Sequence, residues 1–235
     1  MINGKLYIGA DNIANGWFTA RNIKPDSHRN KLRVAANGQS VFYDLSLYGV
    51  DGEETFPLQF GDGRYTVELY RNTSGSRYAV IGRVNLNVKL SSPTAPYLHP
   101  NQYVDYTSES PCTLKAAELC KNCTSSAERV AQVRKWIESN IVYDYIKAAK
   151  VGKSVLPDID DCFRRRMGIC QDIAALMVAM LRSQGVPASL VIGYADTKYH
   201  AWVRVYIDDE VRTYDPYAAI IHKKNVKKYT ALRWY

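Results

Sequence analysis

Gly168-Ile169-Cys170-Gln171-Asp172 opens a stretch in which apolar residues recur every three or four positions, the spacing of one helix face. The pattern stops at Gln184-Gly185-Val186-Pro187, where a glycine followed by a proline favours the end of a helix. Cys170 therefore falls in the first turn of the predicted helix. The partial positive charge and the unpaired N–H groups at a helix N-terminus stabilise a thiolate, so Cys170 is a candidate nucleophile.

Two other residues, which lie later in the chain, complete a candidate catalytic set. His200 lies in Tyr199-His200-Ala201-Trp202, where a strand is predicted over 200–207. Asp215 lies in Tyr214-Asp215-Pro216, directly after a predicted strand at 211–214. Cysteine, histidine and aspartate in this order correspond to a thiol nucleophile, its base and the group that orients the base.

The spacing between the last two strands allows a geometric test of this set. If Asp208-Asp209 is a two-residue hairpin turn, Ile207 pairs with Glu210 and His200 falls opposite Tyr217. His200 and Asp215 are then diagonal neighbours on one face, roughly 7–8 Å apart. A slip of one residue would place them on opposite faces. The spacing permits the pair but does not prove it.

Each of the three residues also has a simpler interpretation. A cysteine on a helix is usually a small buried hydrophobe. A lone histidine beside a tryptophan is usually structural, and an Asp-Pro dipeptide usually marks a turn at the end of a strand. Their shared order, together with their placement on a helix and two strands, favours the catalytic interpretation.

The first ninety residues follow a different pattern. Short runs rich in Val, Tyr, Phe and Leu predict five strands, at 31–35, 41–47, 55–60, 64–70 and 78–90. Turn sequences separate them, at 36–38, 49–52, 61–63 and 72–75. This regular recurrence predicts a β-sandwich of immunoglobulin or fibronectin type over residues 1–92.

A linker and a change of period follow. Ser91-Ser92-Pro93-Thr94-Ala95-Pro96 is typical of a linker, so a second domain is predicted over 97–235. Within it, Ser125-Ser126-Ala127-Glu128 is a capping box. The residues behind it keep helical spacing: Val130, Val133, Trp136, Ile137 and Ile141. The predicted fold class is α+β, with the β-sandwich preceding a mixed domain.

Composition narrows the classes of function. A hydrophobic content of 46% and a charged content of 23% are typical of a soluble globular protein. No segment approaches the roughly 18 consecutive apolar residues of a membrane span, so none is expected. The first ten residues lack the basic start and apolar run of a signal peptide. This leaves open a cytoplasmic protein and a chain whose leader has been removed.

The net charge of +8 is spread along the chain, apart from Arg164-Arg165-Arg166 and a tail at 222–228. No nucleic-acid-binding module is recognisable, so we expect no nucleic-acid partner. A solvated basic surface is the simplest interpretation. The alternative is affinity for an anionic surface such as a cell wall or lipid headgroups.

The chain has five cysteines, so at least one thiol stays free if the others pair. Cys120-Lys121-Asn122-Cys123 has the spacing of a redox or zinc motif, but no second cysteine pair follows. Cys112 could be a third zinc ligand, but no fourth ligand is evident nearby. We therefore expect no metal and no cofactor. Disulfides or buried thiols are expected, with the pairing left open, for Cys112, Cys120, Cys123 and Cys162.

The sequence around the candidate set resembles the core of the transglutaminase-like superfamily of bacteria. The similar segments are Gly168-Ile169-Cys170-x-Asp172, 176–187, Gly193-Tyr194, His200-Ala201-Trp202 and Tyr214-Asp215-Pro216. The resemblance spans roughly residues 128–217 and includes 140–144 and 156–158. Upstream, 56–58 and 100–103 are similar to the N-terminal domain of clostridial-type secreted members.

This resemblance implies a papain-like core in the second domain, with Cys170 as nucleophile, His200 as base and Asp215 as orienting acid. It implies an enzyme that acts on protein or peptide amides, as a cysteine protease or as a transglutaminase. It also implies an extracellular or cell-surface location, with a cytoplasmic one still open. Tyr199, Trp202 and Gln171 are expected to line the substrate cleft.

Two other functions remain. One is a non-catalytic module for cell-surface binding or adhesion that retains the fold, although an intact Cys-His-Asp set argues against it. The other is acetyl transfer from a cofactor thioester by the same three residues. The sequence shows no recognisable nucleotide site for such a cofactor.

Overall fold

The computed structural model describes residues 1–24, 26–45, 53–152, 155–222 and 226–235. The chain divides into two compact units, Met1–Pro96 and Tyr97–Tyr235. Three sequence features lie outside the described residues: the predicted turn at 49–52, the end of the predicted strand 41–47, and Lys223-Lys224 in the basic tail.

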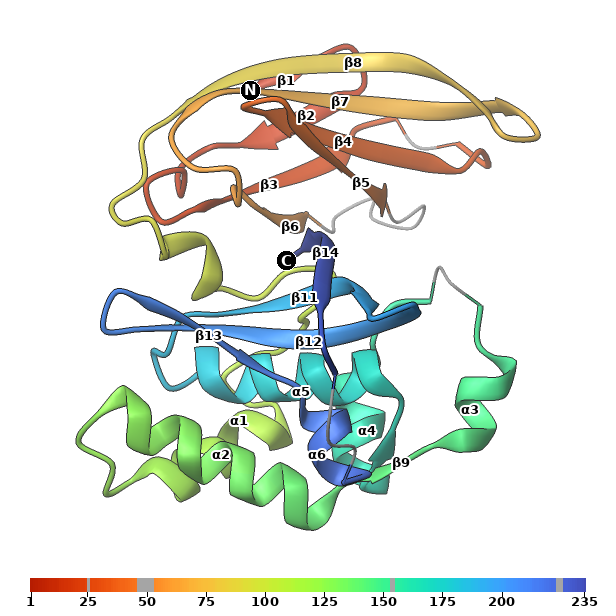
Figure 1. The fold of residues 1–235 in the computed structure, drawn as a ribbon. Helices are drawn as coiled ribbons and strands as arrows, with labels where there is room; N and C mark the ends of the chain where they lie inside the picture. Colours follow the sequence, from red (N-terminus) through yellow and green to blue (C-terminus); the bar gives the residue numbers. More distant parts are fainter. Residues whose placement is uncertain (25, 46–52, 153–154, 223–225) are drawn as a thin grey trace. The chain divides into compact units, whose positions relative to one another are not determined.

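The N-terminal unit consists of two four-stranded antiparallel sheets (Figure 1). One sheet has the order β1-β2-β3-β6, with bounds Ile2–Asn3, Leu6–Gly9, Trp17–Asn22 and Glu54–Pro57. The other has the order β5-β4-β7-β8, with bounds Gln39–Leu45, Asn30–Ala36, Gly63–Ser74 and Arg77–Val88.

The core of this unit lies between the two sheets. Tyr43 of β5 contacts Phe56 of β6 edge to face, with ring centroids 4.9 Å apart. Tyr65, Val67 and Leu69 lie on one face of β7 and are fully buried. Because aromatic rings from both sheets meet, the two sheets share one hydrophobic core.

Sequence reasoning missed the first three strands, although it predicted the other five. β2 and β3 are short and flanked by glycine and asparagine, so their local signal is weak. Their position depends on a contact distant in sequence. A Cβ added to Gly82 of β8 would lie 2.6 Å from the carbonyl oxygen of Asn3 and 2.7 Å from Cβ of Leu6. Only glycine at this position lets the N-terminal strands pass so close to β8.

The C-terminal unit combines one antiparallel sheet with a layer of helices (Figure 1). The sheet has the order β13-β12-β11-β14, with bounds Glu210–Tyr214, Lys198–Ile207, Ala188–Ala195 and Tyr229–Trp234. Helix α5, Cys170–Arg182, lies along the sheet and contacts β11 and β12. Around α5 pack α1, Pro111–Cys120, α2, Ser126–Asn140, and α4, Ile159–Arg165.

Short elements complete the unit. β9, Val142–Tyr143, pairs in parallel with β10, Met167–Gly168. Helix α3 spans Tyr145–Lys150 and helix α6 spans Pro216–Ile220. A 3₁₀ turn, η1, spans Ala95–Tyr97. The mixture of helices and sheets places the chain in the α+β class, as predicted.

The two predicted helices form, and their ends follow local rules. Ser125 Oγ accepts a hydrogen bond from Glu128 N at 3.2 Å, and the Glu128 carboxylate accepts one from Ser125 N at 3.4 Å. This confirms the capping box at the start of α2. After the C-terminal end of α5, Gly185 adopts a φ of +71°, a conformation that favours glycine.

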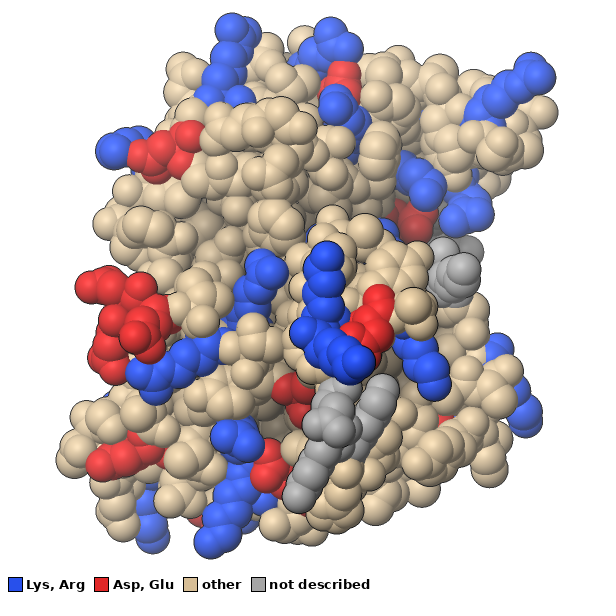
Figure 2. Space-filling model, in the orientation of Figure 1, with Lys and Arg blue, Asp and Glu red and all other residues tan. Residues whose placement is uncertain are grey.

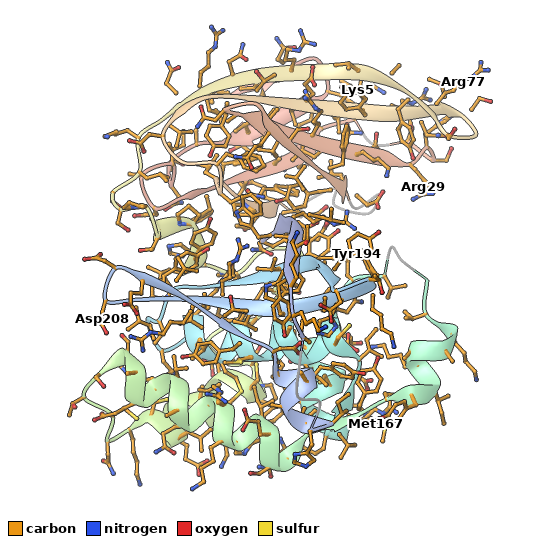
Figure 3. All side chains as sticks on the ribbon, viewed as in Figure 1. Lys5, Arg29, Arg77, Met167, Tyr194 and Asp208 are labelled. Atoms are coloured by element: carbon orange, nitrogen blue, oxygen red, sulfur yellow. The ribbon has the colours of Figure 1, made fainter. Side chains whose placement is uncertain are left out.

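The β12–β13 hairpin has the register that the sequence predicts. Ile207 pairs with Glu210 and Val203 with Tyr214. Asp208 and Asp209 have φ values of +54° and +61°, as a two-residue type I′ turn requires. Figure 3 shows Asp208 at this turn and Tyr194 toward the opposite end of the sheet.

Charged side chains of both signs are dispersed over the face shown in Figure 2. Figure 2 shows Lys and Arg scattered over the visible face with Asp and Glu among them. The run at 164–166 is not a free basic patch, because Arg164 and Arg165 form ion pairs with Asp161 and Arg166 lies over the Trp136 ring. Among the described helices, none is long and apolar enough to cross a membrane.

Candidate active site

Cys170 is the first residue of α5, and the backbone before it is tightly packed. A Cβ added to Gly168 would lie 2.7 Å from Sγ of Cys162 and 3.0 Å from Cβ of Asp172, so only glycine fits there. Gly168 also pairs with Tyr143 across the β9–β10 bridge, which brings Tyr143 to the start of the helix. As the first helical residue, Cys170 has a backbone N–H with no partner inside the helix.

His200 lies near the start of β12 and bonds Asp215. Nε2 of His200 is 2.8 Å from Oδ2 of Asp215, and the two side chains are only 8% and 6% exposed. A carboxylate only accepts hydrogen bonds, so Nε2 carries the proton. The Cys170 side chain borders the same cavities as the imidazole, and it contributes to the raised pKa of His200. The structure thus brings together all three residues of the candidate set.

Asp215 is held in place by three donors. It is the N-cap of α6, and its Oδ1 accepts from Ala218 N at 2.9 Å. Its Oδ2 accepts from the Tyr229 hydroxyl at 2.9 Å in addition to His200. Burial disfavours the charged carboxylate, but these hydrogen bonds and the nearby imidazole keep the pKa of Asp215 below its usual value.

The same neighbours favour the protonated imidazole. Burial lowers the pKa of His200, but the hydrogen bonds and negative charges of Asp215 and Cys170 outweigh it and raise the pKa to about 9. At neutral pH the histidine therefore holds an extra proton beside the sulfur. This is the charge state of an imidazolium that stabilises a thiolate.

Aromatic rings enclose the histidine. Tyr217 contacts the imidazole edge to face, with ring centroids 5.2 Å apart. This agrees with the hairpin register, which predicts Tyr217 near His200. Trp202 lies nearly parallel to the imidazole, with ring centroids 6.4 Å apart. Tyr143 packs on Tyr217 at 4.5 Å. These rings restrict rotation of the imidazole and exclude water from its sides.

Two cavities meet at Cys170 and His200, and both are also bordered by Tyr143 and Tyr199. The first, here called the α3 pocket, has a volume of about 210 Å³ and is further lined by Ala148, Val151, Ile169, Gln171, Ile192 and Ala201. The second, here called the α6 pocket, has a volume of about 310 Å³ and is further lined by Lys198, Asp215, Tyr217 and Ile221. The sulfur and the imidazole thus lie where two pockets join.

A buried carboxylate anchors the wall of the α3 pocket to α5. Asp172, in the first turn of α5, is fully buried and accepts from Nζ of Lys147 at 2.6 Å. It also accepts from the backbone N–H groups of Asp158 and Ile169, at 3.1 Å and 3.0 Å. Lys147 belongs to α3 and Asp158 is the N-cap of α4, so one side chain of α5 holds both of these residues.

The three predicted cleft residues have different positions. Tyr199 borders both pockets, is 39% exposed, and its hydroxyl accepts from Arg233 at 2.9 Å. Gln171 borders the α3 pocket and donates to the Val155 carbonyl oxygen at 2.8 Å. The expectation for Trp202 needs correction, because Trp202 is fully buried and packs against Tyr229 at 5.0 Å. It supports the imidazole from within the core and does not line the cleft.

Sequence reasoning gave no role in the site to four contributors: Tyr143, Lys147, Tyr217 and Tyr229. The hairpin register placed only Tyr217 near His200. The other three reach the site from β9, α3 and β14 through contacts distant in sequence.

The other cysteines are separate from the site chemistry. All five thiols are free, and Cys112, Cys120 and Cys162 are buried. Burial raises the pKa of Cys112 and Cys120 to about 11 and that of Cys162 to about 12, so these thiols stay protonated. Within the described part of the chain, no group of three metal-ligating side chains is present. Cys170 and Cys123 are half-buried, and Cys170 lies beside His200 at the two cavities.

Comparison with known proteins gives a family for this unit. Residues 115–216 match the family model described as the transglutaminase-like superfamily, and the match includes Cys170, His200 and Asp215. The matched segment of the C-terminal unit is thus a transglutaminase-like core. The resemblance inferred from the sequence is thereby confirmed. Members of this superfamily include cysteine proteases and transglutaminases.

The chain is also similar to an individual protein. YebA of Bacillus subtilis, an uncharacterised protein, is 24% identical in an alignment of 144 positions that covers 52% of this chain and 20% of YebA. The match thus spans about a fifth of that curated relative.

Two solved structures are similar over most of the chain. A candidate cysteine protease from Cytophaga hutchinsonii is 15% identical with a TM-score of 0.46, over 86% of this chain and 78% of that one. The periplasmic domain of TgpA from Pseudomonas aeruginosa is 15% identical with a TM-score of 0.45, over 93% and 97%.

Proposed function

We propose that this chain is a thiol-dependent enzyme that transfers or hydrolyses acyl groups of peptide or protein amides. One observation carries the proposal: the imidazole that bonds Asp215 borders the same two pockets as the Cys170 thiol. The match to a superfamily that contains cysteine proteases and transglutaminases supports it.

In the first step the Cys170 sulfur attacks the amide carbonyl carbon and a C–S bond forms. His200 holds the thiol proton, and Asp215 fixes its tautomer and balances its positive charge. The negative charge that develops on the carbonyl oxygen is stabilised by the Cys170 N–H. Tyr143 is proposed as the second donor. Burial, and then the charges of Cys170 and its neighbours, raise the pKa of Tyr143, so its hydroxyl keeps its proton.

In the second step the C–N bond breaks. His200 gives its proton to the leaving amine, and a thioester remains on Cys170. Water or an amine then attacks the thioester and passes a proton to His200, and the thiol is restored. Water as acceptor gives hydrolysis, and a lysine amine gives an isopeptide cross-link. Both use the same residues.

Alkylation with iodoacetamide below pH 7, read out by peptide mass spectrometry, tests the thiol. Cys123 is an internal control, because it is the other half-buried cysteine. We expect Cys170 to be alkylated at least tenfold faster than Cys123, since the thiolate is the reactive form. His200→Ala should reduce the Cys170 rate to that of Cys123. Slow alkylation that does not depend on His200 would support a non-catalytic binding module.

Incubation with a mixture of peptides identifies the reaction. Cleavage products indicate a protease, loss of ammonia from glutamine indicates deamidation, and new isopeptide masses indicate cross-linking. Each product should be absent with Cys170→Ala. If no Cys170-dependent product forms from peptides or from denatured proteins, the proposed activity is wrong.

A further inference from the structure

The two pockets beside Cys170 differ in chemistry. Apart from the shared catalytic pair, the described residues that line the α3 pocket carry no charge, and most of them are aliphatic. The α6 pocket is lined by the charged residues Lys198 and Asp215 in addition to apolar residues such as Ile221. The α3 pocket is therefore the apolar side of the cleft.

The arrangement of the catalytic groups indicates which part of the substrate each pocket receives. Ile169 and Gln171, which flank Cys170, line the α3 pocket, so this pocket adjoins the helix N-terminus that stabilises the carbonyl oxygen. Asp215 and Tyr217 line the α6 pocket, on the side from which the imidazole is oriented. Because His200 protonates the leaving amine, the amine side of the substrate belongs in the α6 pocket. The acyl side then belongs in the α3 pocket.

The size and surroundings of the α3 pocket suit one large apolar side chain. An apolar cavity of about 150 Å³ accommodates benzene, and this pocket has a volume of about 210 Å³. Apolar side chains close in sequence to the lining residues Ala148 and Val151 are also exposed: Tyr145 at 67%, Ile146 at 71%, Val155 at 45% and Leu156 at 39%.

The wall of this pocket is also anchored. Asp172 holds Lys147 and the backbone of Asp158, and Gln171 holds the carbonyl oxygen of Val155. These contacts connect the wall directly to the first turn of α5, where Cys170 lies. A side chain bound in the pocket is therefore positioned relative to the sulfur.

We propose that the α3 pocket binds a large apolar side chain, such as that of leucine or phenylalanine, on the acyl side of the amide. The enzyme then selects substrates in which an apolar residue lies at or immediately before the attacked carbonyl. This inference rests on the proposed function for its biological meaning. Its test uses covalent labelling and does not require turnover.

The probes are dipeptidyl chloromethyl ketones in which each of the two residues is varied among Phe, Leu, Gly and Asp. Each probe alkylates a thiol, so labelling of Cys170 is measured by mass spectrometry and normalised to the iodoacetamide rate of the same protein. We expect Phe or Leu at one position to give at least tenfold faster labelling than Gly, and Asp to be slowest.

Two variants of α3 form a matched pair. Ala148 is half-buried and lines the α3 pocket, whereas Ala149 is exposed on the same helix and does not. Ala148→Phe should fill the pocket and reduce the preference for Phe or Leu over Gly to less than threefold. Ala149→Phe should keep the preference of the original protein. A second filling variant, Val151→Phe, should behave like Ala148→Phe.

The outcomes separate this inference from the proposed function. Equal labelling by all probes in the original protein, or a preference unaffected by both filling variants, would show that the pocket does not select the acyl side. The same holds if no probe labels Cys170 while iodoacetamide still does. An apolar preference without any amide product in the peptide mixture would support the pocket and contradict the enzymatic function.

Discussion

Glu68 in the N-terminal unit and Asp215 in the C-terminal unit are carboxylates with almost the same burial, 5% and 6% exposed. Glu68 bonds Arg33 at 3.0 Å and Arg83 at 2.8 Å, and both arginines reach solvent. Asp215 bonds one imidazole, which is itself buried and faces a thiol. A buried carboxylate alone therefore does not mark an active site. The difference is that histidine exchanges a proton near neutral pH, whereas arginine does not.

The largest expected effect separates the thiol of the site from the other half-buried thiol. Cys170→Ala should abolish the Cys170-dependent reaction, a loss of roughly 10⁴-fold or more, because no nucleophile remains. Cys123→Ala should leave the rate unchanged, since Cys123 bonds no histidine among the described residues. The rate is measured on whichever peptide the mixture experiment identifies. Comparable losses in both variants would mean that Cys170 has no special role.

The next effect concerns the two carboxylates directly. Asp215→Asn should lower kcat by roughly 10²–10⁴-fold, because an amide neither fixes the same histidine tautomer nor balances the imidazolium charge. Glu68→Gln should leave kcat unchanged, since no described nucleophile adjoins Glu68. Circular dichroism of both variants shows whether the fold is kept. A normal rate in folded Asp215→Asn would contradict the orienting role of Asp215.

The sequence was sufficient where one local rule decided the structure. Two aspartates between two strands predict a two-residue turn, and that turn sets the register that places Asp215 near His200. The capping box at Ser125 and the glycine at 185 likewise gave the ends of two helices. In each case the determining residues lie within a few positions of the feature.

The sequence was insufficient where partners distant in the chain decide. Tyr229 reaches Asp215 from β14, a strand that local patterning did not indicate. Lys147 neutralises Asp172 from a six-residue helix with no buried residues, which leaves no amphipathic signal. Trp202 was expected in the cleft, but neighbouring strands and Tyr229 cover it. Such positions depend on tertiary packing, which outweighs local pattern.

The response to alkali should differ between the units. The pKa of His200 is raised from 6.5 to about 9, so folded His200 binds its proton more tightly than unfolded His200 does. Its contribution to stability is complete below pH 6.5 and is lost as the pH rises to about 9. Taking about 1.4 kcal/mol for each tenfold change in proton affinity, the loss is on the order of 3 kcal/mol.

Acid should lower the stability of both units. The pKa values of both Glu68 and Asp215 are lowered: burial opposes the lowering in each case, and the bonded cationic partners outweigh it. Each carboxylate contributes fully to stability above the pKa that it has in the unfolded chain. This contribution is lost as the pH falls through the lower pKa that it has in the folded protein.

Hydrogen exchange measured by mass spectrometry resolves the two units, after correction for the intrinsic pH dependence of exchange. Between pH 6.5 and 9, protection should fall in α5 and β12 but not in β7 and β8. His200→Gln should remove this difference. If both units lost the same amount of protection between pH 6.5 and 9, His200 would not be the group that titrates.

The smallest expected effect tests whether Glu68 is only structural. Glu68→Gln should destabilise the N-terminal unit by about 1–2 kcal/mol, because it weakens charged hydrogen bonds to two arginines that can still be hydrated. Asp44→Asn on the same sheet is the control. Asp44 is 51% exposed and pairs with Arg29 at 3.5 Å, so its loss should not be measurable by urea unfolding. If Glu68→Gln instead lowered the protection of α5 or the rate at Cys170, the N-terminal carboxylate would influence the thiol site, and the contrast between the two carboxylates would have to be abandoned.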